Sequence, residues 1–179
     1  LFCECHLNPL LQTPDLARIR KLADKYNFIV CVDETVCNFL NVHVLHFADI
    51  VCSSLTKVFS GDLNVMAGLL ILNPSLLWYN KLKNYFNESY EDLFWAEDAL
   101  YLERNSRDFA ERSAKINTNG AAAVKVLEEL PLINKVYFPL LLELKCHYDA
   151  IKTPNGGYGG LLSFLFTDPA DAVCFFNDT

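Results

Sequence analysis

Residues 48–61 read Ala48-Asp-Ile-Val-Cys-Ser-Ser-Leu-Thr-Lys57-Val-Phe-Ser-Gly61. The apolar first part, Ala48–Cys52, predicts a buried strand, and the hydroxyl-rich second part predicts a turn that carries one lysine. Another apolar run, Phe28–Val32, ends in Asp33-Glu34-Thr35, so that Asp33 lies 24 residues before Lys57. The sequence therefore predicts two strands, the first ending in an acidic group and the second leading into a lysine.

The apolar runs predict an α/β layered domain with a largely parallel sheet. They show no alternation with polar residues, as expected for strands that are covered on both faces. Thr13-Pro14-Asp15 predicts a helix between the first two strands, with Thr13 as its N-cap. An order of strand, helix and strand favours parallel pairing. The predicted strands are Leu1–Cys5, Phe28–Val32, Ala48–Cys52 and Val65–Leu72.

The second half of the chain predicts helices followed by a second domain. Pro74–Tyr85 is predicted to be helical, as is the long stretch Trp95–Leu130, in which Asn119-Gly120 is a candidate interruption and alanines 121–123 favour continuation. We place a boundary near Pro131, giving a large domain over residues 1–130 and a second domain over residues 131–179. The second domain is predicted to contain strands Lys135–Phe138 and Gly160–Phe166, a loop at 153–160 and a helix over Pro169–Phe176. Two strands and one helix cannot bury their apolar faces alone, so we expect an incomplete domain.

Composition excludes several classes of function. The net charge is −7, the isoelectric point is about 5.0 and no basic patch is visible, which argues against nucleic acid as a partner. The most apolar stretch, Val65–Leu72, is too short to span a bilayer. Seven cysteines without a Cys-x-x-Cys pair indicate a reduced, cytoplasmic protein. The histidines show no metal-ligand spacing. Because the chain begins with Leu1, we expect its true N-terminus to lie upstream.

Lys57 and Asp33 together match the needs of a pyridoxal phosphate (PLP) site. A lysine forms the Schiff base with the cofactor, and an aspartate keeps the pyridine nitrogen protonated so that the ring acts as an electron sink. Ser54 and Thr56 offer hydroxyls to a phosphate. Taken singly, each group has a simpler interpretation: Asp33 as a helix cap, Lys57 as a surface lysine and the hydroxyls as turn hydrogen bonds.

Several stretches resemble the Cys/Met-metabolism branch of the PLP-dependent transferases, and most closely the fungal-type cystathionine γ-synthases. These are Asp33-Glu34-Thr35, Ser54-Leu-Thr-Lys57 with Gly61, Glu4-Cys-His-Leu-Asn8-Pro9-Leu10, Leu102–Arg112, Val136–Pro139 and Gly159–Phe164. The resemblance covers almost the whole chain. It implies the fold type I, aspartate-aminotransferase-like architecture of three layers, with the beginning of a smaller C-terminal α+β domain.

The resemblance also implies roles for single residues. Lys57 is the cofactor-binding lysine and shuttles protons on the substrate, Asp33 pairs with the pyridinium nitrogen, and Ser54 and Thr56 donate to the phosphate. We expect burial among the strands to disfavour the ammonium form of Lys57. Asn8 is implied to lie near the phenolic oxygen of PLP, although Asn-Pro is also a plain turn signal. Thr35 is implied to lie against the ring, although a helix cap is equally compatible.

The implied activity joins cysteine to an O-acyl-homoserine to give cystathionine, in methionine biosynthesis and in a homodimer or homotetramer. A cystathionine β- or γ-lyase and an O-acylhomoserine sulfhydrylase would use the same groups. No residue matches the family's substrate-carboxylate arginine, its ring-stacking tyrosine or its Gly-rich phosphate turn. We therefore expect an internal fragment that is inactive alone, and a non-catalytic remnant or interaction module is the alternative of another class.

Overall fold

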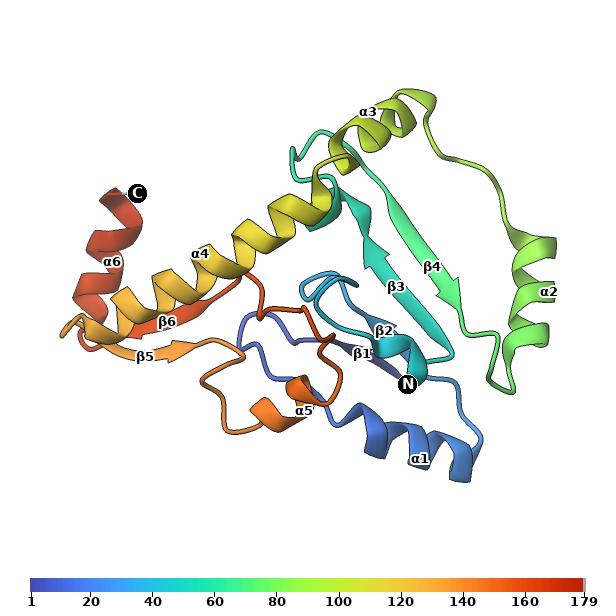
Figure 1. The fold of residues 1–179 in the computed structure, drawn as a ribbon, viewed down its shortest axis with the longest axis horizontal. Helices are drawn as coiled ribbons and strands as arrows, with labels where there is room; N and C mark the ends of the chain where they lie inside the picture. Colours follow the sequence, from blue (N-terminus) through green and yellow to red (C-terminus); the bar gives the residue numbers. More distant parts are fainter. Residues whose placement is uncertain (179) are drawn as a thin grey trace.

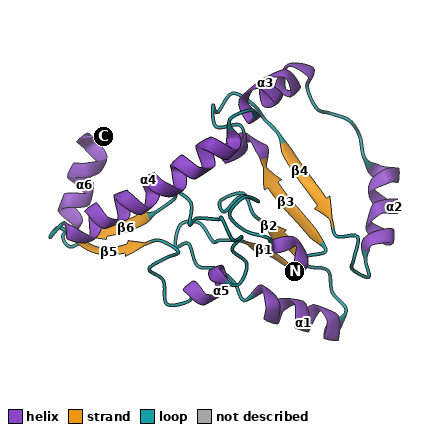
Figure 2. Ribbon diagram, in the orientation of Figure 1, coloured by secondary structure: helices purple, strands orange, loops and turns teal. Residues whose placement is uncertain are grey.

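The computed structural model describes residues 1–178 and contains two β-sheets connected by a long helix (Figure 1). The first sheet has four strands in the order β1-β2-β3-β4, and the second has the two strands β5 and β6. Figure 2 shows the two sheets set apart, with α4 running between them. Within residues 1–178, no helix is both long and apolar enough to cross a membrane.

The first sheet contains β1 (Phe2–Glu4), β2 (Cys31–Asp33), β3 (Ile50–Ser54) and β4 (Gly68–Leu72). β1, β2 and β3 are parallel, and β4 pairs antiparallel with β3. The predicted mostly parallel α/β sheet is therefore confirmed. The prediction that every strand is covered on both faces is wrong for β4, where Leu70 and Ile71 are exposed, because apolar composition alone does not reveal what packs on a strand.

Helix α1 (Leu16–Tyr26) connects β1 to β2, as predicted, but it begins later than predicted. The cap is Asp15 and not Thr13: an Asp15 carboxylate oxygen accepts a hydrogen bond of 2.9 Å from the Arg18 backbone N–H. Arg20 of α1 forms an ion pair of 2.9 Å with buried Asp49, whose carboxylate also accepts from the Val30 N–H. One carboxylate thus holds α1 against the starts of β2 and β3.

The chain from β4 onward differs from prediction mainly in where helices begin and end. α2 spans Tyr79–Ser89, α3 Ala96–Ser106 and α4 Phe109–Glu129. The predicted long helical stretch is interrupted at Arg107-Asp108, whereas α4 continues through Asn119-Gly120. The remaining elements are β5 (Ile133–Tyr137), α5 (Lys145–Asp149), β6 (Ser163–Phe166) and α6 (Pro169–Asp178), together with short turns of helix at Val44–His46 and Leu55–Phe59.

Two hydrophobic clusters form the core. The larger lies between the first sheet, α1 and α5, and includes Val32, Val51 and Tyr148. The smaller joins Val124 of α4 to β5 and to Phe138. Tyr158, in the glycine-rich loop before β6, packs against both clusters. The domain boundary near Pro131 stays a prediction.

Candidate active site

The carboxyl ends of the three parallel strands meet at one edge of the first sheet. Glu4 of β1 pairs with Asp33 of β2, and Asp33 in turn pairs with Cys52 of β3. Segments that leave the sheet here are those that bind ligands in open α/β folds. Asn8, Thr35 and Lys57 all lie in these segments, and together they line one groove of about 590 Å³.

Thr35 connects the end of β2 to the end of β3. Its backbone N–H donates to a carboxylate oxygen of Asp33 over 2.9 Å, and its hydroxyl oxygen accepts from the Ser54 N–H over 2.8 Å. Asp33 and Ser54 face a second groove, of about 910 Å³, together with β4 and α2. Asp33 and Lys57 therefore line different grooves, and Thr35 links them, because it lines the Lys57 groove and is hydrogen-bonded to Asp33 and Ser54.

The turn Leu55–Phe59, here called the lysine turn, places Lys57 beyond β3. Lys57 has φ −83° and ψ −115°, which interrupts the helical path. Its side chain is exposed, so the expected burial among the strands is wrong. The physical reason is position: the turn follows the last paired residue of β3, and Lys57 points into the open groove and away from the core.

Thr56 lines neither groove. Its hydroxyl oxygen accepts from the Ala67 N–H over 3.0 Å, and the hydroxyl donates to the Ala67 carbonyl over 3.3 Å. A phosphate contact from Thr56 would replace the second of these bonds. The hydroxyl therefore holds the lysine turn against the strand that follows it, and its predicted phosphate role stays a prediction.

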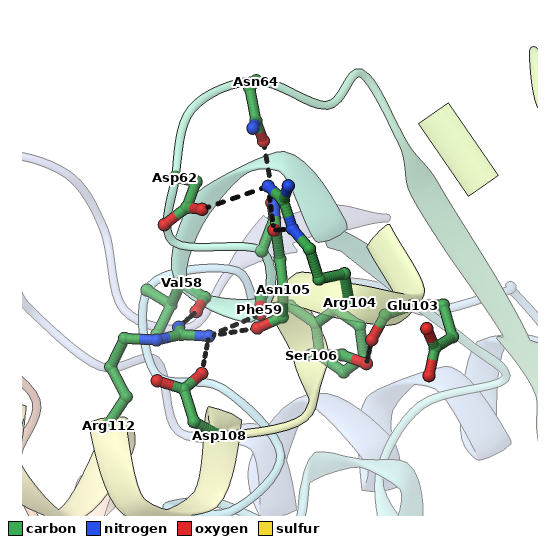
Figure 3. Close-up of polar contacts among 11 residues, drawn as sticks. Val58, Phe59, Asp62, Asn64, Glu103, Arg104, Asn105, Ser106, Asp108 and Arg112 are labelled. Carbon is green, nitrogen blue, oxygen red and sulfur yellow. Dashed lines mark hydrogen bonds and ion pairs between the residues drawn. The ribbon is translucent and has the colours of Figure 1, made fainter. Parts of the chain in front are cut away.

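Two polar residues of the second half of the chain support the lysine turn, and sequence reasoning gave them no role (Figure 3). Arg112 of α4 donates to the carbonyls of Val58 and Phe59, and Asn105 of α3 donates to the Ser60 hydroxyl. Both lie in the motif Leu102–Arg112, and the resemblance of that motif to the family is the sequence feature that could have pointed to them. Spacing alone does not show that this segment folds back onto a turn about 50 residues earlier.

Burial shapes the electrostatics beside Asp33. Glu34 is buried, and the loss of hydration, followed by the nearby charge of Asp33, raises the pKa of Glu34 to about 7. Burial also raises the pKa of the Cys52 thiol to about 12, and the neighbouring thiol of Cys31 adds to this effect. Of these two adjacent acids, Asp33 faces a groove and Glu34 is buried.

The chemistry of these groups fits PLP. Lys57 supplies an amine for an aldehyde, Asp33 a carboxylate for a ring nitrogen, and Ser54 a hydroxyl for a phosphate. All three follow or end parallel strands at one edge of the sheet. Asn8 and Thr35 share the Lys57 groove. Sheet and groups together are those of the fold type I class of PLP-dependent enzymes.

Comparison with known proteins agrees with this class. Residues 1–178 match the family described as Cys/Met metabolism PLP-dependent enzyme, and the chain belongs to that family. It is 51% identical over 177 residues to the cystathionine gamma-synthase of Neurospora crassa and 48% identical over 186 residues to that of Saccharomyces cerevisiae. Each alignment covers 99% of this chain but 28% and 29%, respectively, of the relative.

Solved structures give the same fold. The cystathionine gamma synthase of Xanthomonas oryzae pv. oryzae, in complex with aminoacrylate and cysteine, superposes with a TM-score of 0.85 at 25% identity. The match covers 99% of this chain and 45% of that one. The chain thus spans less than a third of these curated relatives and under half of the matched structure. The predicted fold type I architecture is confirmed.

Proposed function

We propose that this chain is part of a cystathionine γ-synthase, which joins cysteine to an O-acyl-homoserine. In the reaction the cysteine sulfur bonds to Cγ, the Cγ–O bond breaks, and a carboxylic acid leaves with the thiol proton. The observation that carries the proposal is that Asp33 ends β2 and Lys57 follows the adjacent parallel strand β3, with Thr35 hydrogen-bonded to both strand ends. The identity of 51% to the Neurospora crassa enzyme supports this choice of reaction.

PLP, when bound, supplies an electron sink that stabilises negative charge on the substrate carbons. Lys57 Nζ would hold the cofactor covalently and, when free, would move protons at Cα and Cβ of the substrate. Asp33 keeps a proton on the ring nitrogen, and the Thr35 N–H holds the carboxylate in place. Ser54 donates to the phosphate from the end of β3. Asn8 and Thr35 form part of the wall of the Lys57 groove.

Two further properties follow from the same proposal. We expect the protein to act as a homodimer or homotetramer. Many apolar side chains, including Leu70 and Tyr90, are exposed, which is consistent with contacts to other subunits or to other parts of the protein. We also expect it in the cytoplasm. All seven cysteines are free, although Cys5 and Cys37 have sulfur atoms 3.5 Å apart, as suits a reducing compartment.

The test is chemical labelling of the protein with its flanking sequence. PLP is added, the adduct is reduced with borohydride, and the digested peptides are mapped. We expect the label on Lys57, its loss in K57A and its retention in K115A, which removes an exposed lysine of α4. A label on another lysine would contradict the proposal.

The same preparation tests Asp33. D33N should still be labelled at Lys57, because the covalent and phosphate contacts remain. It should form cystathionine about 10²-fold more slowly or worse, because a preorganised charge is lost. D62N, which changes an exposed acid near the lysine turn, is the control. Near-normal turnover in D33N would remove Asp33 from the site.

A further inference from the structure

The lysine turn leaves backbone carbonyls that its own short helix cannot satisfy. The helical path is interrupted at Lys57 and ends at Phe59, so the last carbonyls have no partner in a following turn. Two bonds close the turn from within: Ser60 N–H donates to the Leu55 carbonyl over 2.9 Å and Gly61 N–H to the Lys57 carbonyl over 2.8 Å. The carbonyls of Val58 and Phe59 are left for another group.

Arg112 supplies that group from α4. Its guanidinium donates to the Val58 carbonyl, to the Phe59 carbonyl over 3.1 Å and to the Asn105 carbonyl over 2.8 Å. A planar guanidinium reaches several acceptors in fixed directions, which a lysine ammonium on its flexible stem does not reproduce. One side chain thus ties the residues that follow Lys57 to the junction between α3 and α4.

Gly61 makes room for this contact. It has φ +81°, in the left-handed region that favours glycine. A Cβ at this position would lie 2.7 Å from a guanidinium nitrogen of Arg112. Any side chain at residue 61 would therefore push Arg112 away from the lysine turn.

Asn105 adds a second attachment. Its side chain is buried and donates to the Ser60 hydroxyl over 2.9 Å and to the Asn64 side-chain oxygen over 2.8 Å. Figure 3 shows Asn105 and Arg112 approaching the turn from the ends of α3 and α4. The residues that follow Lys57 are thereby attached to both α3 and α4.

We propose that Arg112 is a positioning residue that fixes the direction in which Lys57 meets the cofactor. This inference rests on the proposed function, in which Lys57 carries PLP. The simpler role of Arg112 is its ion pair with Asp108 one helical turn earlier, at 3.1 Å. Asp108 is largely exposed, and such pairs contribute little to stability. Three of the four contacts go instead to main-chain carbonyls, and two of these, of Val58 and Phe59, belong to the lysine turn.

The experiment compares R112Q, R112K and R107Q in the protein with its flanking sequence. Arg107 is an exposed arginine paired with Glu103, so R107Q removes the same charge without touching the turn. In the cofactor-free protein, hydrogen exchange by mass spectrometry should be faster in residues 55–61 of R112Q than of wild type. With PLP added, R112Q should attach cofactor to Lys57 about tenfold more slowly, as expected for lost charge-assisted hydrogen bonds.

R112K should fall between wild type and R112Q, because it keeps the charge but not the fork of donors. R107Q should equal wild type in both measurements. If R112Q or R112K attaches PLP at the wild-type rate with unchanged exchange at 55–61, the inference is overturned, whatever happens to the melting temperature. R112K supplies this test if R112Q does not fold. If wild type itself is not labelled at Lys57, the proposed function fails and this inference with it.

Discussion

Glu34 and Asp33 are adjacent carboxylates in different surroundings. Asp33 faces a groove and accepts from Thr35, whereas Glu34 is 2% exposed and its Oε1 has no hydrogen-bond partner within residues 1–178. Burial first, and the charge of Asp33 second, raise the pKa of Glu34 to about 7. Glu34 is therefore partly protonated at neutral pH, and ionising it fully costs folding free energy.

The pH dependence of stability follows in sign. A carboxyl with a raised pKa binds more protons in the folded than in the unfolded state, so its favourable contribution is complete below pH 4.5 and is lost as the pH rises through 7. E34Q cannot ionise and escapes this loss. Relative to wild type, E34Q should gain about 3 kcal/mol in free energy of unfolding between pH 4.5 and pH 8.

Urea unfolding at several pH values measures this difference, with E128Q on the exposed face of α4 as the control. His6 changes stability in the opposite direction, since burial lowers its pKa to about 4. That contribution is common to wild type and E34Q and cancels in the comparison. A difference that does not vary with pH would show that Glu34 ionises normally in the folded protein.

At this scale the sequence predicted the principal groups better than their surroundings. Lys57 and Asp33 were predicted from the ends of two apolar runs, because parallel strands bring their carboxyl ends together. The exposure of Lys57 and the backbone contacts of Thr56 were not predicted from the sequence, because they depend on where the turn leaves the sheet. Arg112 acts on carbonyls 53 and 54 residues away in sequence, a contact that no local pattern contains.

Helices and strands were mostly predicted in kind but displaced at their ends. β2 begins three residues later than the apolar run that predicted it. The Val30 carbonyl already accepts from the Asp49 and Ile50 N–H groups, but the regular ladder begins at Cys31. The break between α3 and α4 falls at Arg107-Asp108, where the chain turns so that Asn105 and Arg112 both reach the lysine turn. β4 is antiparallel, which apolar composition cannot distinguish from parallel pairing.

Gly120 lies inside α4, where the sequence suggested a possible interruption. Glycine allows α4 to contact the glycine-rich loop closely at this position. A Cβ would lie 2.4 Å from the Gly159 carbonyl oxygen and 3.0 Å from the Gly160 Cα. Alanine favours helix by about 1 kcal/mol over glycine, so helix propensity alone predicts that G120A stabilises. We expect the opposite for G120A, a loss of about 1–3 kcal/mol in free energy of unfolding, because the backbone of the loop or of α4 would have to move to make room for the Cβ.

The matched control is A122G, on an exposed position of the same helix. It should cost about 1 kcal/mol from propensity alone. Thermal and urea unfolding of both variants give the comparison. If G120A proves more stable than wild type, α4 and the glycine-rich loop are not in direct contact.

Across the whole molecule, one reciprocal amide pair connects three distant segments. Asn41 follows the end of β2, Asn117 lies on α4, and each side chain donates to the oxygen of the other, over 3.1 and 2.8 Å. The same two oxygens accept from the Gly157 and Gly159 N–H groups of the glycine-rich loop. Gly159 also lines the Lys57 groove, so this pair sets one wall of the candidate site.

Removing either amide should therefore loosen the first sheet, α4 and the loop together. N117A loses three hydrogen bonds and leaves the Gly159 N–H without its partner, which should cost about 2–3 kcal/mol in free energy of unfolding. N119A, at an exposed position two residues further along α4, should change stability by less than about 0.5 kcal/mol.

The double variant decides whether the two amides act as a unit. Because Asn41 and Asn117 share their bonds, N41A/N117A should cost clearly less than the sum of N41A and N117A. Urea unfolding of all four proteins gives the coupling energy, for which we expect at least about 1 kcal/mol. Strict additivity would mean that each asparagine binds its part of the loop separately, and that α4 and the segment after β2 approach the Lys57 groove without being held to one another.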